Sequence, residues 1–161
     1  MAIADRLAYY KVPGVSIAVI SDGRVEWARG FGSTAAQSGT PVDADTLFQA
    51  ASLSKHVAAI VALRLVEQGT LSLDKDVNLK LRSWKAPDNE FTKTEKVTLR
   101  RLLNHSAGLT VHGFPGYAMN APVPTLVQVL DGRAPANTPA IRVDTVPGSL
   151  WRYSGGSWPP A

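Results

Sequence analysis

The sequence predicts a mixed α/β (α+β) fold, in which a β-hairpin comes first and helices follow. Two apolar, alternating stretches flank the turn signal Ser21-Asp22-Gly23, which predicts the hairpin. The strongest helical pattern lies later, at residues 52–68. The chain has 161 residues, of which 45% are hydrophobic and 19% charged, so it can form a packed core. We expect one domain over residues 1–161, with a sheet portion at 1–50 and a helical portion at 51–161.

The elements of the sheet portion are expected near the N-terminus. Residues 3–11 place apolar side chains on one side, which predicts a helix. Residues 15–20 and 24–31 predict the two strands of the hairpin. The small and polar residues 32–43 predict a loop. A hairpin alone is marginal in water, and an unpaired sheet edge tends to recruit another strand.

The helical portion contains one long helix and shorter ones. Apolar residues recur at helical spacing over residues 52–68. Residues 70–96 predict an irregular chain with short helical pieces. A second helix is expected over residues 99–105, capped by Thr98, and a third over residues 126–130. Three tryptophans are expected to anchor the core: Trp27, Trp84 and Trp151.

Composition excludes several classes of function. The chain has no cysteine, which excludes disulfides, thiolate nucleophiles and Cys-rich zinc sites. No apolar run approaches the roughly 20 residues of a membrane span. The first residues lack the pattern of a secretory signal, so the localisation stays unknown. The net charge of +4 lies wholly in residues 81–161, where basic and acidic side chains are interleaved. Such dispersed charge is typical of a solvated surface and not of a nucleic-acid binder.

The candidate for catalysis is the pair Ser52 and Lys55. On a helix, this spacing places the hydroxyl and the ammonium one turn apart on the same face. At a first turn both groups feel the positive end of the helix dipole, which favours a developing oxyanion, and a neighbouring amine can activate a serine. The spacing by itself is a weak signal, because Ser72 and Lys75 repeat it without an apolar helix to follow. The alternative interpretation makes Ser52 a helix N-cap and Lys55 a solvated lysine.

Further segments, in a fixed order along the chain, accompany this pair. They are Val12-Pro-Gly-Val15, Trp27-Ala-Arg-Gly-Phe-Gly32, Phe48-Gln-Ala-Ala-Ser-Leu-Ser-Lys55, Leu63-Arg-Leu-Val-Glu-Gln-Gly69, Val97-Thr-Leu-Arg-Arg-Leu-Leu-Asn-His-Ser-Ala-Gly-Leu109 and Trp151-Arg-Tyr-Ser154. In these segments the chain resembles the serine β-lactamase and penicillin-binding-protein superfamily, especially class C β-lactamases and family VIII carboxylesterases. The resemblance extends to about residue 156 and implies a β-lactamase/transpeptidase-like fold.

The resemblance also implies roles for individual residues. Ser52 would be the acylated nucleophile and Lys55 its general-base partner. Tyr153 matches the tyrosine of the family's Tyr-x-Asn motif and would act with Lys55 in moving the proton. The implied reaction is two-step acyl transfer through an acyl-Ser52 intermediate, with the Ser52 backbone N–H as one oxyanion donor and with no metal or organic cofactor. The asparagine of the motif is Gly155 here, which leaves a substrate-binding position without its amide.

The family's third motif, Lys-Thr-Gly or His-Thr-Gly on a late strand, does not occur in this sequence. We therefore expect an incomplete fold, truncated after about residue 156, that lacks the C-terminal strands. Two functions follow. One is a serine hydrolase that acts on an ester, an amide or a β-lactam. The other is a catalytically inactive fragment that serves as a binding or assembly module, by self-association or with a complementing C-terminal half.

The three histidines receive structural interpretations. His105 is expected in a turn, and His56 on the helix surface or at the rim of a pocket. His112 is isolated in the sequence, so no metal cluster is predicted.

Overall fold

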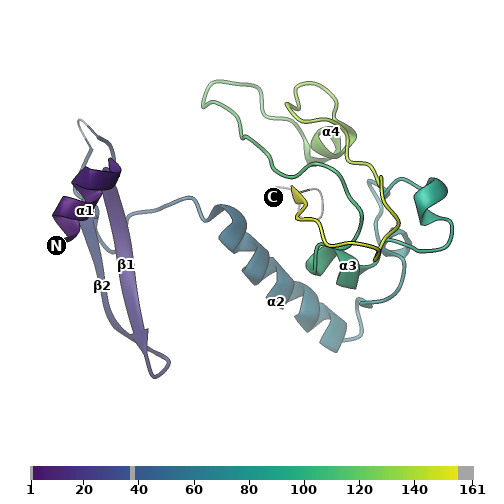
Figure 1. Ribbon diagram of the computed structural model, residues 1–161, viewed down its shortest axis with the longest axis horizontal. Coiled ribbons are helices and arrows are strands. Elements are labelled where there is room, and N and C mark those ends of the chain that lie inside the picture. Colours follow the sequence, from purple (N-terminus) through teal and green to yellow (C-terminus); the bar gives the residue numbers. More distant parts are fainter. Residues whose placement is uncertain (1, 37–38, 156–161) are drawn as a thin grey trace. The chain divides into compact units, whose positions relative to one another are not determined.

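The computed structural model describes residues 2–36 and 39–155. The chain forms two compact units, Met1–Ala51 and Ser52–Ala161 (Figure 1). The first unit holds helix α1 and the hairpin, and the second holds helices α2, α3 and α4. Within the described ranges, no helix is long and apolar enough to cross a membrane.

The first unit is a short helix followed by a two-stranded antiparallel sheet. Helix α1 (Ile3–Tyr10) leads to strand β1 (Gly14–Ser21), which pairs with strand β2 (Arg24–Gly32). The turn residues Asp22 and Gly23 both have positive φ, +49° and +72°. Two such residues form the turn whose backbone twist matches the twist of the strands. The predicted hairpin is confirmed.

The loop after β2 folds back onto the hairpin. Ser33 pairs with Pro41 in an isolated bridge, and the amide of Val42 donates to the carbonyl oxygen of Gly32 at 3.0 Å. Val42 is buried, and its backbone carbonyl occupies the space that a Cβ atom at Gly30 would need. Only glycine therefore fits at this point of β2.

The second unit begins with the helix that was most evident in the sequence. The 3-10 turn η1 (Ala51–Leu53) runs into helix α2 (Ser54–Glu67), so the predicted helix over 52–68 is confirmed apart from its tighter first turn. Two more 3-10 turns, η2 (Val77–Leu79) and η3 (Glu90–Thr92), are the short helical pieces expected in the irregular stretch that follows.

Helices α3 (Leu99–Leu103) and α4 (Leu126–Asp131) both begin at a threonine. The hydroxyl of Thr98 accepts from the third amide of α3, and that of Thr125 does the same for α4, which satisfies one of the free donors at each helix start. The predicted extension of α3 to His105 is wrong. With φ +61°, His105 lies in the left-handed region, and a residue in this conformation cannot continue a right-handed helix.

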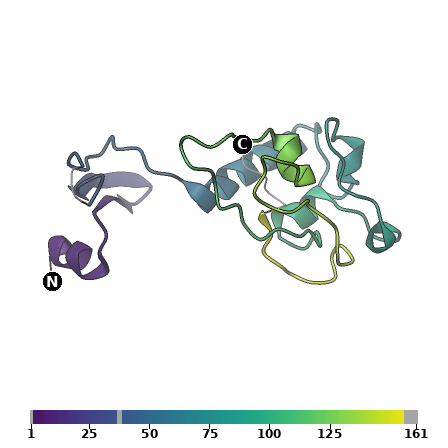
Figure 2. The same cartoon turned by 90° about the horizontal axis from the view of Figure 1, so that it is seen from above.

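The core of the second unit is formed by residues of its loops and short helices, the elements that Figure 2 shows from above. Its buried members are Ala86, Val97, Ala107, Leu109, Leu130, Ile141 and Val143. Trp84 packs against this cluster, and its indole N–H donates to the carboxylate of Asp131 at 3.1 Å. The expectation that Trp84 anchors the core is confirmed.

Trp151 does not anchor the core. Its side chain is 69% exposed, because the extended chain here turns Arg152 and Ser154 inward and Trp151 outward. Trp27 is half-buried on β2, where the guanidinium of Arg29 lies 5.9 Å from the centre of its ring. Trp151 therefore lacks the role that the sequence suggested, whereas for Trp27 that role stays a prediction.

Candidate active site

Three side chains singled out in the sequence meet in the second unit. The hydroxyl oxygen of Tyr153 lies 2.8 Å from Oγ of Ser52. Nζ of Lys55 donates to the same Oγ at 3.4 Å and lies 5.2 Å from the centre of the Tyr153 ring. They share a hollow of about 410 Å³. The residues that line it are Ser52, Lys55, His56, Ala59, Leu103, His105 and Tyr153.

Local chain geometry brings Ser52 and Lys55 together. Ser52 lies in η1 and Lys55 in the first turn of α2, so their side chains share one face of the helix start. The residue before Ser52, Ala51, has φ +44°, a left-handed conformation that costs an alanine roughly 1–2 kcal/mol. The N-cap position of α2 is Leu53, and no side chain caps the helix there. The interpretation of Ser52 as an N-cap is therefore wrong, and its hydroxyl is free to pair with Tyr153.

The surroundings of Tyr153 in the hollow lower its pKa. The hydrogen bond with Ser52 is the main cause that lowers the pKa of Tyr153, and Lys55 lowers it further through hydrogen bonding and charge. Burial lowers the pKa of His105, and the positive charge of Lys55 adds to this effect. The neutral imidazole is thereby favoured at the edge of the same hollow.

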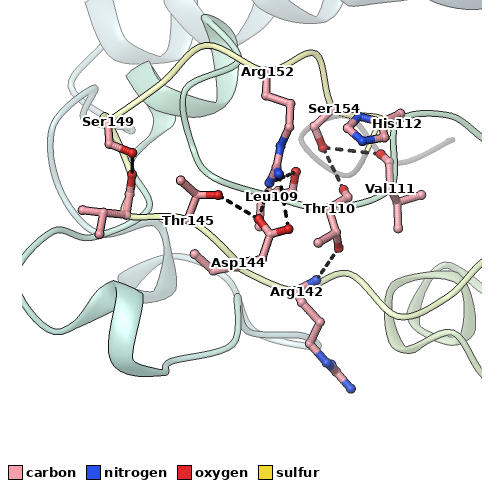
Figure 3. A network of polar contacts seen from close by, with 12 residues as sticks. Leu109, Thr110, Val111, His112, Arg142, Asp144, Thr145, Ser149, Arg152 and Ser154 are labelled. Carbon is pink, nitrogen blue, oxygen red and sulfur yellow. Dashed lines mark hydrogen bonds and ion pairs between the residues drawn. The ribbon is translucent and has the colours of Figure 1, made fainter.

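The segment that carries Tyr153 is anchored on one side by Arg152. Its guanidinium forms an ion pair with the carboxylate of Asp144 and donates from Nη2 to the carbonyl oxygen of Leu109 at 3.2 Å (Figure 3). The pKa of Asp144 is lowered, chiefly by the hydrogen bonds from Arg152. The carboxylate is thus kept in the charged form that holds the arginine.

Ser154 anchors the other side of the segment. It is buried, and its hydroxyl donates to the carbonyl oxygen of Thr110 at 2.9 Å (Figure 3). Side chains alternate along extended chain. With Arg152 and Ser154 both held in the fold, the side chain of Tyr153 between them points to the other side, where it meets Ser52.

Gly155, the expected substrate-binding position, is not among the residues that line the hollow. It is buried, and a Cβ atom there would lie 3.0 Å from a ring carbon of Phe114 and 3.3 Å from the backbone of Gly113. A side chain at this position would therefore meet Phe114 first. The second serine–lysine pair, Ser72 and Lys75, lies in an irregular stretch outside any helix, as expected from its lack of an apolar pattern.

The contact of the His105 side chain with Tyr153 was not predicted from the sequence. The expected turn is confirmed by its positive φ, but the ring also lines the hollow, 4.6 Å from the ring of Tyr153 between centres. A lone histidine in a turn carries no sequence signal for such a contact. His56 lines the hollow, in keeping with the expected position at a rim. In the part of the chain that the structure describes, no group of histidine and acidic side chains could hold a metal ion.

The site combines a serine, a lysine one helical turn further on and a tyrosine hydroxyl beside both. Together with a chain that forms a hairpin first and helices afterwards, this site is typical of the class of β-lactamase-like serine hydrolases. The comparison with known families agrees with this class. The chain belongs to the beta-lactamase family, whose model matches residues 2–158.

Curated relatives resemble the chain over a little less than two thirds of its length. It is 33% identical over 99 residues to esterase EstB of Burkholderia gladioli, a match that covers 62% of this chain and 25% of that protein. It is 36% identical over 101 residues to penicillin-binding protein 4 of Amycolatopsis lactamdurans, covering 62% of this chain and 26% of the relative. The match thus spans about a quarter of the length of these relatives.

Solved structures share the fold over nearly the whole chain. An octameric penicillin-binding protein homologue from Pyrococcus abyssi is 29% identical, with a TM-score of 0.72 over 97% of this chain and 35% of that one. EstCE1, a hydrolase with promiscuous acyltransferase activity, is 26% identical, with a TM-score of 0.74 over 96% of this chain and 42% of that one. The structure is therefore part of a β-lactamase/transpeptidase-like α/β fold, consisting of the N-terminal hairpin and the helices after it.

Proposed function

We propose that this chain carries the acyl-transfer centre of a serine hydrolase, with Ser52 as the nucleophile. The observation that supports it most directly is the distance of 2.8 Å between the hydroxyl oxygens of Ser52 and Tyr153, with the Lys55 ammonium beside both. A serine hydroxyl is a weak nucleophile unless an adjacent base removes its proton. The phenolate form of Tyr153, which a lowered pKa makes more accessible, would be such a base within hydrogen-bond reach.

In the first step, Oγ of Ser52 forms a bond to the substrate's carbonyl carbon while its proton passes to the phenolate of Tyr153. The carbonyl oxygen takes up the negative charge, and the backbone N–H of Ser52 would be one of its donors. When the tetrahedral intermediate collapses, the bond to the leaving group breaks, and the leaving group takes the proton from Tyr153. The product of this step is acyl-Ser52.

In the second step, a water molecule attacks the acyl carbon and gives its proton to Tyr153. The bond to Oγ of Ser52 then breaks, the acid is released, and the proton returns to Ser52. The amine of Lys55, 5.2 Å from the centre of the Tyr153 ring, would hold the phenolate by charge. The hydroxyl that contacts Ser52 directly is that of Tyr153, at 2.8 Å against 3.4 Å for Lys55, so we assign the proton transfer to the tyrosine.

The substrate class is an ester or an amide, a β-lactam included. Similarity to an esterase and to a penicillin-binding protein supports this range. We place esters first, because an alcohol or phenol leaves more readily than an amine. Ester cleavage therefore needs less stabilisation of the oxyanion by the surrounding groups. The position of Gly155, packed against Phe114, supplies no amide for the recognition of a β-lactam side chain.

The test uses a chromogenic short-chain ester and a chromogenic cephalosporin, offered to the parent protein and to Ser52→Ala. Ser54→Ala, which removes the neighbouring exposed serine of α2, is the matched control. We expect Ser52→Ala to lose about 10³-fold or more of the esterase rate and Ser54→Ala to keep it. Mass spectrometry of the quenched reaction should find one acyl group on the peptide that contains Ser52. If the parent turns over neither substrate faster than Ser52→Ala, the chain is not an enzyme by itself.

One observation favours a second function, that of a binding or assembly module. Helix α2 has no buried residue, and three of its apolar side chains, Val57, Ile60 and Val61, are more than half exposed. Exposed apolar surface and a two-stranded sheet both suit association, with a second copy or with a chain that brings further strands. Native mass spectrometry tests it: assembly predicts oligomers, whereas a strictly monomeric chain that unfolds cooperatively would count against this function.

A further inference from the structure

The ring of His105 lies against the residue on which the proposed chemistry depends. Its centre is 4.6 Å from that of the Tyr153 ring, with 34° between the planes, and 6.1 Å from the Trp151 ring, nearly edge-on. The left-handed backbone of His105, just after α3, directs the ring into this position. His105 thus touches the outward-facing side chains of the segment that carries Tyr153.

His105 also binds the backbone of that segment at two points. Its carbonyl oxygen accepts from the amide of Arg152 at 2.9 Å, and its Nδ1 accepts from the amide of Ser154 at 3.4 Å. These two amides flank Tyr153 in the chain. One residue therefore holds both sides of the tyrosine, through a backbone bond and through a ring bond.

The ring bond defines the protonation state of His105. A backbone amide can only donate, so Nδ1 must carry a lone pair, and the proton of the neutral ring lies on Nε2. In the charged imidazolium both ring nitrogens carry protons, and Nδ1 would face the Ser154 amide donor to donor. The bond between His105 and Ser154 therefore exists only in the neutral form.

His112 makes the opposite bond to the same segment. Its Nδ1 lies 2.8 Å from the carbonyl oxygen of Tyr153, which can only accept, so Nδ1 of His112 carries the proton. This bond is compatible with both the neutral and the charged ring. Of the two histidines that bind the segment, only His105 loses its contact on protonation.

The surroundings of His105 oppose its protonation. The charged and titratable groups in the hollow are Lys55 and His56 from α2 and Tyr153 from the last described segment. Burial, aided by the positive charge of Lys55, lowers the pKa of His105. Nδ1 of His105 therefore remains a hydrogen-bond acceptor down to a lower pH than the ring nitrogen of an exposed histidine would.

We propose that His105, as its neutral Nε2–H tautomer, is a positioning residue for Tyr153, and that its protonation releases Tyr153 from Ser52. The consequence for turnover rests on the function proposed above, whereas the position of the phenol does not. Tyr153 reaches Ser52 from a segment whose two neighbouring amides, those of Arg152 and Ser154, both bind His105. Loss of the bond between the His105 ring and Ser154 should therefore raise the pKa of Tyr153 toward its ordinary value of 10.0.

The first test is the titration of the tyrosines by NMR with a ¹³C label at Cζ, in which Tyr153→Phe identifies the resonance of Tyr153. His105→Phe keeps an aromatic ring but has no acceptor. His105→Asn restores an acceptor oxygen and tolerates the left-handed backbone. We expect the pKa of Tyr153 to rise in His105→Phe and to stay low in His105→Asn. His56→Phe, in the same hollow, is the control and should leave the titration unchanged.

Two further measurements complete the test. Imidazole ¹⁵N NMR should show Nδ1 of His105 without a proton and Nδ1 of His112 with one. If the chain turns over an ester, His105→Phe should lower kcat by about tenfold with KM little changed, and His105→Asn should lose the acid limb of the pH profile that the parent shows. An unaltered Tyr153 titration in His105→Phe, or a proton on Nδ1 of His105, would overturn the proposal. A chain without turnover that passes both NMR tests would contradict only the proposed function.

Discussion

The hydroxyl of Tyr153 and the hydroxyl of Ser52 lie 2.8 Å apart, although 101 residues separate them in the chain. No local interaction produces this contact. It depends on the folding of the loops between α2 and the last described segment, where Arg152 and Ser154 anchor the chain on either side of the tyrosine. The proposed proton transfer is therefore a property of the second unit as a whole.

Removal of the Tyr153 hydroxyl should lower the reaction rate without lowering the stability of the fold. In Tyr153→Phe the hydroxyl is lost, and we expect the esterase rate to fall about 10²- to 10⁴-fold, the usual contribution of a general base. The melting temperature should change little, because Tyr153 is 37% exposed and its hydroxyl contacts no core group. Steady-state kinetics and a thermal melt measure both. A full esterase rate in Tyr153→Phe would show that the phenol is not the base.

Loss of the lysine charge should act through the tyrosine. Lys55 lowers the pKa of Tyr153, second to the hydrogen bond with Ser52. In Lys55→Met we expect the Tyr153 titration to move upward, so the phenolate needed for catalysis forms only at higher pH. The alkaline shift of the esterase pH profile should match the shift in the NMR titration. Lys75→Met, the lysine of the second pair, is the control and should change neither.

The ion pair of Arg152 with Asp144 should make the segment sensitive to acid. The pKa of Asp144 is lowered from 3.8, so near that pH the unfolded chain binds more protons than the folded one. The stability from this pair is present above pH 3.8 and is lost as the pH falls through the lower value of the folded protein. Between about pH 6 and about pH 3, the melting temperature of the parent should drop by more than that of Asp144→Asn.

Asp74 offers a matched control for this pair. It binds Arg100 through a comparable carboxylate–guanidinium contact, at 2.6 Å and away from Tyr153. Asp74→Asn should also reduce the acid sensitivity, but only Asp144→Asn should raise the pKa of Tyr153. The same rise in both variants would contradict the anchoring role of Asp144.

Gly108 should be the least replaceable glycine near the site. It has φ +71°, and a Cβ atom there would overlap the carbonyl oxygen of Thr145. We expect Gly108→Ala to destabilise the second unit by about 2 kcal/mol or more, from backbone strain and from the displaced chain. Gly116 has φ +81° with open space around it. Gly116→Ala therefore introduces backbone strain but no steric overlap, and it should lower the free energy of unfolding by less. Urea unfolding compares the two variants. Equal losses in the free energy of unfolding would show that the overlap with Thr145 contributes nothing.

Restoration of the family's asparagine should not create a β-lactamase. In Gly155→Asn the new side chain meets Phe114 at the position of its Cβ atom, 3.0 Å from the ring. We expect a lower melting temperature and no gain in cephalosporin turnover. Phe114 packs against the core, so Phe114→Ala is destabilising by itself, but in its background Gly155→Asn should cost less stability than in the parent, since the obstructing ring is gone. A gain in cephalosporin turnover in the single variant would show that residue 155 does face the substrate.

Local elements could be predicted because short-range interactions decide them. The turn at Asp22 and Gly23, the apolar repeat of α2 and the threonine caps of α3 and α4 each act within a few residues. The approach of Ser52 to Lys55 belongs to the same group, because helical spacing alone brings residues three apart onto one face. The largest error at the end of a helix was that of α3, where His105 turns left-handed to contact a distant segment.

The sequence by itself determined the order of the elements, the serine–lysine pair and, through its motifs, the family. Only the tertiary structure decided that Tyr153 faces Ser52, that Trp151 is exposed and that Gly155 packs against Phe114. The physical reason is that the direction of a side chain on an extended segment depends on how the residues beside it are held. Here the ion pair of Arg152 and the buried hydroxyl of Ser154 hold the residues on either side of Tyr153. Both depend on partners more than seven residues away in the chain.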